Sequence, residues 1–148
     1  MSDRVAIVAI GGNSLITDKQ HEDVASQVRA VEETCRHIAG LLERDYDLVI
    51  THGNGPQVGF SLRRSDLSQH ELHPVPLDSC VADTQGAIGY NIQMALGNEL
   101  HRLGIERTVV SLVTQMVVRA DDPAFQSPSK PIGSFMSEAV ALQRQREG

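Results

Sequence analysis

The sequence predicts an α/β fold with an open, mainly parallel sheet that is sandwiched by helices. Residues 4–10 and 48–50 are short, continuous apolar runs, which is typical of strands that are buried on both faces of a parallel sheet. Between them, residues 21–44 carry apolar side chains at steps of three and four, the spacing of an amphipathic helix. Strand, helix and strand in this order predict a right-handed βαβ unit.

Glycine and proline separate the elements that follow. A short helix is predicted over 56–68, because its first position is a proline. A longer helix is predicted over 77–103 and ends at Gly104. Gly86 and Gly89 lie inside this helix and suggest a bend or close packing partway along it.

The last third of the chain predicts one more strand and one more helix. The valine-rich stretch 108–118 predicts a third strand, and a proline-flanked extended loop follows at 127–133. Ser137 is placed to cap a final helix over 138–146. Three strands are few for a sheet, which typically has about five or six. We therefore expect a sequence that is cut inside a domain.

Composition and charge narrow the class of protein. A length of 148 residues with 41% hydrophobic and 22% charged residues fits one soluble globular domain. No apolar run approaches the ~20 residues of a membrane span, and the opening residues do not resemble a signal peptide, so we expect a cytoplasmic protein without a membrane partner. The formal charge of −6 argues against a nucleic-acid partner. Cys35 and Cys80 form no CxxC pair and are predicted to be buried thiols.

Both early strands end in loops that contain glycine and asparagine. Ligands bind at the carboxyl ends of neighbouring strands in open parallel sheets. Glycine lets backbone N–H groups approach a phosphate, a following helix adds its positive end, and asparagine adds an uncharged donor. One such loop would be an ordinary turn, whereas two matched loops favour a site. The candidate phosphate-binding residues are Gly11, Gly12, Asn13, Gly53, Asn54 and Gly55.

The second loop allows a different interpretation. Residues 53–59, Gly-Asn-Gly-Pro-Gln-Val-Gly, differ by one position from a dinucleotide-binding fingerprint. They follow the second strand rather than the first, and no strand that ends in an acidic residue appears about twenty residues later. A dinucleotide-binding protein is therefore the weaker alternative.

Two kinds of isolated residue remain as candidates. Of thirteen basic residues only Lys19 and Lys130 are lysines, and Lys130 lies between two prolines. A cation on a stiff loop could neutralise charge on transferring oxygens, although a lone lysine is more often solvated. His52 either donates to a bound anion or fixes the strand end through backbone hydrogen bonds. His70 and His73 lack further ligands at metal spacing, so no metal site is predicted.

Four motifs, in this order, resemble those of carbamate kinase in the amino acid kinase family, and together they cover essentially the whole chain. They are Ala-Ile-Gly-Gly-Asn-Ser at 9–14, Thr-His-Gly-Asn-Gly-Pro-Gln-Val-Gly at 51–59, Pro-Leu-Asp-Ser-Cys-Val-Ala-Asp-Thr-Gln-Gly-Ala-Ile-Gly-Tyr at 76–90 and Lys-Pro-Ile-Gly at 130–133.

The resemblance implies a fold in which the acceptor binds in the amino-terminal half and the nucleotide in the carboxy-terminal half. Residues 1–148 would be the acceptor-binding half, with a protruding loop around 119–136. The two glycine loops would surround carbamate and the transferred phosphoryl group, and Lys130 would be a catalytic cation. It would replace the lysine that many amino acid kinases place before the first loop, where this chain has Ala9-Ile10. The nucleotide-binding half of the family has no counterpart here.

The implied function is reversible phosphoryl transfer, in which carbamoyl phosphate and ADP give ATP and carbamate in arginine catabolism. ATP or ADP and Mg²⁺ would be the cofactors, carbamate or carbamoyl phosphate the substrate, and a homodimer the assembly. The alternative from another class is a truncated, non-catalytic binding or scaffold fragment that retains only the acceptor loops.

Overall fold

The chain begins with the predicted βαβ unit. The structure, a computed structural model, describes residues 4–15, 23–132 and 136–147. Strand β1 (Val5–Ile10) and strand β2 (Asp47–His52) are parallel neighbours, and helix α1 (Val24–Leu42) connects them. The register places Val5 opposite Asp47 and Ile10 opposite His52, so both strands end at the same edge. The α/β class and the parallel sheet are confirmed.

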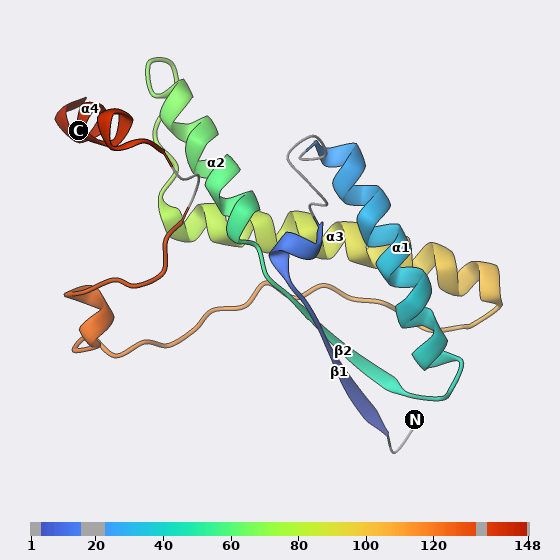
Figure 1. Cartoon of the computed structure of the whole chain (residues 1–148). Helices are drawn as coiled ribbons and strands as arrows, with labels where there is room; N and C mark the ends of the chain where they lie inside the picture. The colour runs from blue at the N-terminus through green and yellow to red at the C-terminus, as the bar shows by residue number, and fades with distance from the viewer. Residues whose placement is uncertain (1–3, 16–22, 133–135, 148) are drawn as a thin grey trace.

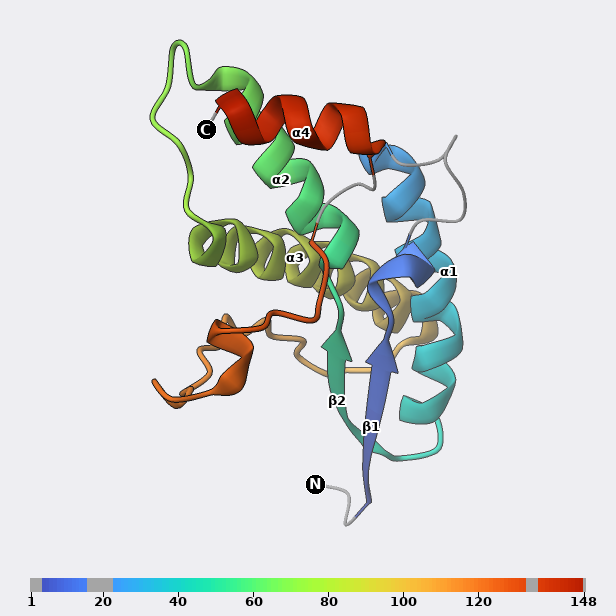
Figure 2. The same ribbon diagram turned by 60° about the vertical axis from the view of Figure 1, so that its left-hand side comes forward.

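The remaining helices follow the predicted order (Figure 1). Helix α2 (Gly55–Ser68) begins directly after β2, and α3 (Leu77–Leu103) crosses behind the strands in Figure 2. Gly104 ends α3 with a φ of 69°, the left-handed conformation that favours glycine. Two short 3-10 helices, η1 (Gly12–Leu15) and η2 (Pro123–Phe125), and the final helix α4 (Glu138–Glu147) complete the described elements.

The hydrophobic core lies between α1, α3 and one face of the sheet. Its buried side chains are Ile10, Leu15, Val31, Cys35, Ile38, Ala39, Ile88, Ile92, Ala95, Leu96 and Leu100. Burial, with smaller contributions from Glu32 and Glu99, raises the pKa of the Cys35 thiol to about 11. Both cysteines are buried and unpaired, as predicted.

The prediction that the strands are buried on both faces is wrong in this structure. The side chains of Val5, Ile7 and Val49 are 65%, 74% and 49% exposed. They alternate with core-facing neighbours, so no described element covers the second face. A continuous apolar run makes a strand suitable for burial on both faces. Among the described residues, only one face of this sheet is covered.

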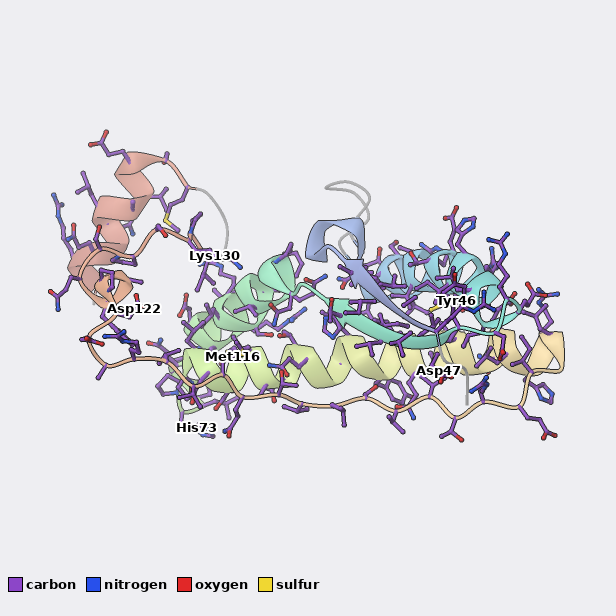
Figure 3. All side chains as sticks on the ribbon, turned by 90° about the horizontal axis from the view of Figure 1, so that it is seen from below. Tyr46, Asp47, His73, Met116, Asp122 and Lys130 are labelled. Atoms are coloured by element: carbon purple, nitrogen blue, oxygen red, sulfur yellow. The ribbon has the colours of Figure 1, made fainter. Side chains whose placement is uncertain are left out.

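The predicted third strand at 108–118 is also wrong, since the sheet of the described residues has two strands. This stretch instead runs along α3 (Figure 3). The Thr114 N–H donates to Gln85 Oε1 at 2.8 Å, and a Cβ added to Gly89 would lie 3.1 Å from Ser111 Cβ. A strand needs a neighbouring strand to hydrogen-bond with its backbone. Here the stretch contacts side chains of α3 instead. The close packing predicted at Gly89 is confirmed.

Within the described ranges, no helix is both long and apolar enough to cross a bilayer.

Candidate functional site

The two glycine loops contact each other directly, backbone against backbone. A Cβ added to Gly12 would lie 3.1 Å from both Gly53 C and Asn54 N. A Cβ added to Gly53 would lie only 2.8 Å from Gly12 N. Neither position has room for a side chain, because the loops leave parallel strands at the same edge of the sheet. Gly12, Gly53 and Asn54 are therefore brought together, as the sequence predicted.

Gly53 continues the ladder of the sheet by one residue. Its N–H donates to Ile10 O at 2.8 Å, and its carbonyl lies 3.3 Å from His52 Nδ1. The Gly53 N–H thus already has an acceptor, and the contribution of Gly53 is its close approach to Gly12. His52 is half-buried and interacts with the backbone of its own loop. This contact favours the second of the two roles considered for His52.

The second loop opens directly into α2. Asn54 is the residue that precedes the helix, and its side chain makes no capping hydrogen bond. Gly55 is exposed, and a Cβ added there would meet nothing within 4 Å. The first turn of a helix leaves backbone N–H groups without intrahelical acceptors and carries a partial positive charge. The start of α2 therefore offers donors beside the contact between Gly12 and Gly53.

The side chain of Asn54 is directed toward α3. Its Nδ2 donates to Thr84 Oγ1 at 2.9 Å, and Thr84 Oγ1 donates to Val81 O at 2.8 Å. Thr84 is 4% exposed, and this partly buried chain of hydrogen bonds joins the second loop to the long helix. Sequence reasoning missed Thr84, because the apolar spacing of 77–103 accounts for the packing of the helix and not for its polar contacts.

Gln57 is the second residue that sequence reasoning missed. It lies in the first turn of α2 and is 8% exposed. Its Nε2 donates to Gln27 Oε1 in the first turns of α1 at 3.3 Å. Its Oε1 is buried and has no hydrogen-bond partner among the described atoms. The sequence carries no signal for this contact, because the burial of Gln57 depends on how α1 and α2 pack together.

Lys130 is exposed and lies on the stretch between η2 and α4, beside α2 in Figure 3. Every described residue from 110 to 132 is exposed. Gly11 is exposed just before η1. Gly133 and the side chain of Asn13 lie outside the part of the chain that the structure describes.

The described side chains contain no group of three histidine, cysteine, aspartate or glutamate residues that could hold a metal ion. No chemical step is therefore assigned to a metal held by this chain. The site at the strand ends consists of backbone donors and neutral amide and hydroxyl groups.

Comparison with known proteins identifies the family. The sequence model of the amino acid kinase family matches residues 4–140. The chain belongs to the amino acid kinase family. Its curated relatives within the family include carbamate kinase-like protein YahI of Escherichia coli, which is 48% identical over 91% of this chain and 43% of the relative. The carbamate kinase of Pyrococcus horikoshii is 44% identical over 99% of this chain and 47% of the relative.

Solved structures of the same kinase family agree with the fold. Carbamate kinase from Giardia lamblia bound to citric acid superposes with a TM-score of 0.89 at 32% identity. That match covers all of this chain and 48% of the other. The same enzyme bound to AMP-PNP gives a TM-score of 0.85 at 34% identity. The chain thus spans about half the length of the carbamate kinases that it matches.

Proposed function

We propose that this chain is the acceptor-binding half of a carbamate kinase-like phosphotransferase. The observation that carries the proposal is the backbone contact between Gly12 and Gly53, at the carboxyl ends of β1 and β2 and beside the uncapped start of α2. Two converging glycine loops and a helix start supply the N–H donors that a phosphoryl group requires. The likeness to carbamate kinases supports carbamate as the acceptor.

The proposed reaction is reversible phosphoryl transfer. From carbamoyl phosphate and ADP, the bond between the carbamate oxygen and phosphorus breaks, and a bond from phosphorus to the terminal oxygen of ADP forms. The products are carbamate and ATP. In this chain, Gly11, Gly12, Asn13 and Gly55 would surround the phosphoryl group, while Gly53 and Asn54 would hold the two loops together. In arginine catabolism this direction would yield ATP.

Lys130 has the proposed role of a catalytic cation. Charge spreads over the phosphoryl oxygens as the group transfers, so a cation in contact with them lowers the barrier. Lys130 would act on the phosphoryl group from the protruding stretch of residues 119–136. ADP, ATP and Mg²⁺ would be bound by the half of the relatives that this chain does not match. Homodimer formation, expected from the family resemblance, belongs to the same proposal.

The second candidate is a non-catalytic binding fragment, and the residue set at the strand ends favours it. The described residues there supply backbone donors and neutral side chains, and the described side chains contain no group of three metal-ligating residues. Such a fragment would bind phosphate or carbamoyl phosphate without transferring it. The two candidates therefore differ in turnover and agree in binding.

ATP formation from ADP and carbamoyl phosphate tests the proposal. We expect the 148-residue chain alone to stay at background, because phosphoryl transfer depends on several positioned cations around the transferred group. Addition of the complementary half of the Pyrococcus horikoshii carbamate kinase should give turnover above that of either part alone. Robust turnover by this chain alone would show that the second half is not needed. Binding without turnover in every mixture would favour the fragment.

A further inference from the structure

Residues 107–114 run alongside β2 in the same direction without pairing with it. Where both segments begin, Arg107 Nη1 lies 2.9 Å from Asp47 Oδ1. Where they end, the Asn54 side chain and the Thr114 N–H hydrogen-bond to adjacent side chains of α3, at 2.9 and 2.8 Å. The two segments are equally long and meet the same helix at both ends. They are therefore parallel and in step with each other.

One edge of β2 is open. The N–H groups of Asp47 and Gly53 donate to β1 at 2.9 and 2.8 Å. Backbone N–H groups alternate in direction along a strand, so those of Leu48, Ile50 and His52 point to the opposite edge. Among the described residues no other strand pairs with that edge, because the sheet contains β1 and β2 alone.

The stretch of residues 107–114 presents an accessible edge as well. Val110, Leu112 and Val113 are exposed, and residues 108–113 have no described hydrogen bond to the backbone of another element. Val109 packs in part against the hydrophobic core, as Leu48 and Ile50 of β2 do. The region between the two segments is therefore apolar toward α3 and open along both edges.

The spacing of strands explains why the two segments do not pair. Hydrogen-bonded strands lie about 4.8 Å apart, and strands with one other strand between them lie about 10 Å apart. The starts of the two segments are joined through the long side chain of Arg107 and not through backbone. Figure 3 shows β2 between β1 and this stretch, with α3 running along both segments. This arrangement leaves a gap between β2 and residues 107–114 that suits one strand.

The order of the elements identifies the occupant of the gap. Neighbouring parallel strands are connected by a crossover, usually a helix. Helix α4 follows residues 107–114 along the chain, and the described residues include no strand after it. This chain spans about half the length of the carbamate kinases that it matches. A right-handed crossover through α4 would bring the next strand of such a protein beside residues 107–114.

We propose that the gap binds one apolar, parallel strand from the half of the carbamate kinases that this chain does not match. The inference rests on the proposed function, which makes this chain one half of such an enzyme. It adds the surface at which the second half joins the first. Residues 107–114 gain their strand partner only when that half is bound, because the incoming strand hydrogen-bonds to both segments.

Amide hydrogen exchange of the 148-residue chain, with and without the complementary half of the Pyrococcus horikoshii carbamate kinase, tests the inference. The N–H groups of Leu48, Ile50 and His52 should exchange at least about tenfold more slowly in the mixture, because they gain acceptors. Those of Val49 and Thr51 point to β1 by the same alternation and should change less. Failure to form a complex, or a complex without this difference along β2, would overturn the inference.

Two proline variants give a matched pair. Leu112→Pro and Val113→Pro each remove one exposed N–H, and alternation along an extended backbone directs only one of these two groups toward β2. One variant should bind the complementary half about tenfold more weakly, and the other should lose clearly less affinity. Val117→Pro lies outside residues 107–114 and should bind as the wild type does. Equal affinities of the Leu112 and Val113 variants would contradict a strand beside this stretch.

A second copy of this chain is the competing occupant. If the chain alone dimerises in light scattering and then protects Leu48, Ile50 and His52 as strongly as the mixture does, the copy fills the gap and the inference is wrong. The proposed function is judged separately. Turnover in the mixture without protection along β2 would remove only the docking surface. Protection along β2 with glycine loops that do not respond to phosphate would remove only the acceptor site.

Discussion

The glycine loops and the stretch that carries Lys130 differ in how the chain holds them. Gly12 and Gly53 touch through their backbones, and Asn54 is tied to α3 through the buried Thr84 hydroxyl. Lys130 belongs to a stretch, 110–132, in which every residue is exposed. The donors of the proposed site are thus preorganised by packing within this chain, whereas its cation lies on an exposed stretch. Preorganised groups contribute to binding in the isolated chain, and the cation contributes only in a completed site.

The largest expected effect concerns Lys130 in the mixture with the complementary half. Lys130→Ala should lower kcat by about 10²-fold or more, because the charge acts on the transferring group. The KM for ADP should stay nearly unchanged. Lys130→Arg retains a positive charge and should lose less than the alanine variant. Steady-state ATP formation gives kcat and the KM for ADP of the wild type and of both variants. An effect confined to nucleotide affinity would assign Lys130 a different role.

The contact between the two loops should be visible in stability. Gly53→Ala places a Cβ 2.8 Å from Gly12 N, where backbone must shift, and should reduce the free energy of unfolding by about 1–3 kcal/mol. Gly55→Ala is the matched control, because an added Cβ there meets nothing within 4 Å. Denaturation in urea followed by circular dichroism gives both values. Equal stability of the two variants would contradict the packed arrangement of the loops.

The Thr84 hydroxyl tests the anchor of the second loop. Thr84→Val removes the hydrogen bonds to Asn54 and Val81 and should cost about 1 kcal/mol while weakening phosphate binding. Thr34→Val removes a comparable hydroxyl, which donates to Ala30 O at 2.8 Å within α1. It should leave phosphate binding unchanged. If both variants bind phosphate as the wild type does, the Thr84 hydroxyl does not hold the second loop in its binding conformation.

The smallest effect is expected from ion pairs at the surface. Arg107 lies 2.9 Å from Asp47 and 3.4 Å from Asp45, and so joins the segment after α3 to the start of β2. Arg107→Gln should cost less than about 1 kcal/mol and should matter less at high salt. Arg119→Gln breaks the pair with Asp121 inside the exposed stretch and should have no measurable effect. Urea denaturation at low and high salt measures the free energy of unfolding of both variants. An equal loss of this free energy in the two variants would contradict the difference between the packed part of the chain and the exposed stretch.

Much of the fold was predictable because local patterns and the core agree. The apolar spacing of α1 matches the buried positions Val31, Cys35 and Ile38, and Gly104 ends α3 in the left-handed conformation. The third strand was not predictable in this way. A valine-rich run reports a preference for extended backbone, whereas a strand also needs a partner, and 108–118 lies along α3 instead.

The candidate site was predictable only in its glycine loops. Two turns after neighbouring parallel strands must meet at one edge, so the contact of Gly12 with Gly53 follows from the topology. Thr84 and Gln57 could not be assigned, because their roles depend on which helix face lies against Asn54 and Gln27. Whether Lys130 reaches the loops was likewise not readable, since tertiary contacts and not local sequence place an extended segment.

A phosphate titration of the 148-residue chain, followed by backbone amide shifts, tests most directly whether the two glycine loops form a preorganised phosphate site. We predict binding with a Kd on the order of millimolar and shifts that cluster at Gly11, Gly12 and the first turn of α2. Gly55→Val should abolish these shifts, because its side chain would fill the open space at the start of α2. Gly97→Val, at an equally open position on α3, should retain them. Unperturbed loops in a folded wild-type chain would contradict the assignment of the acceptor site.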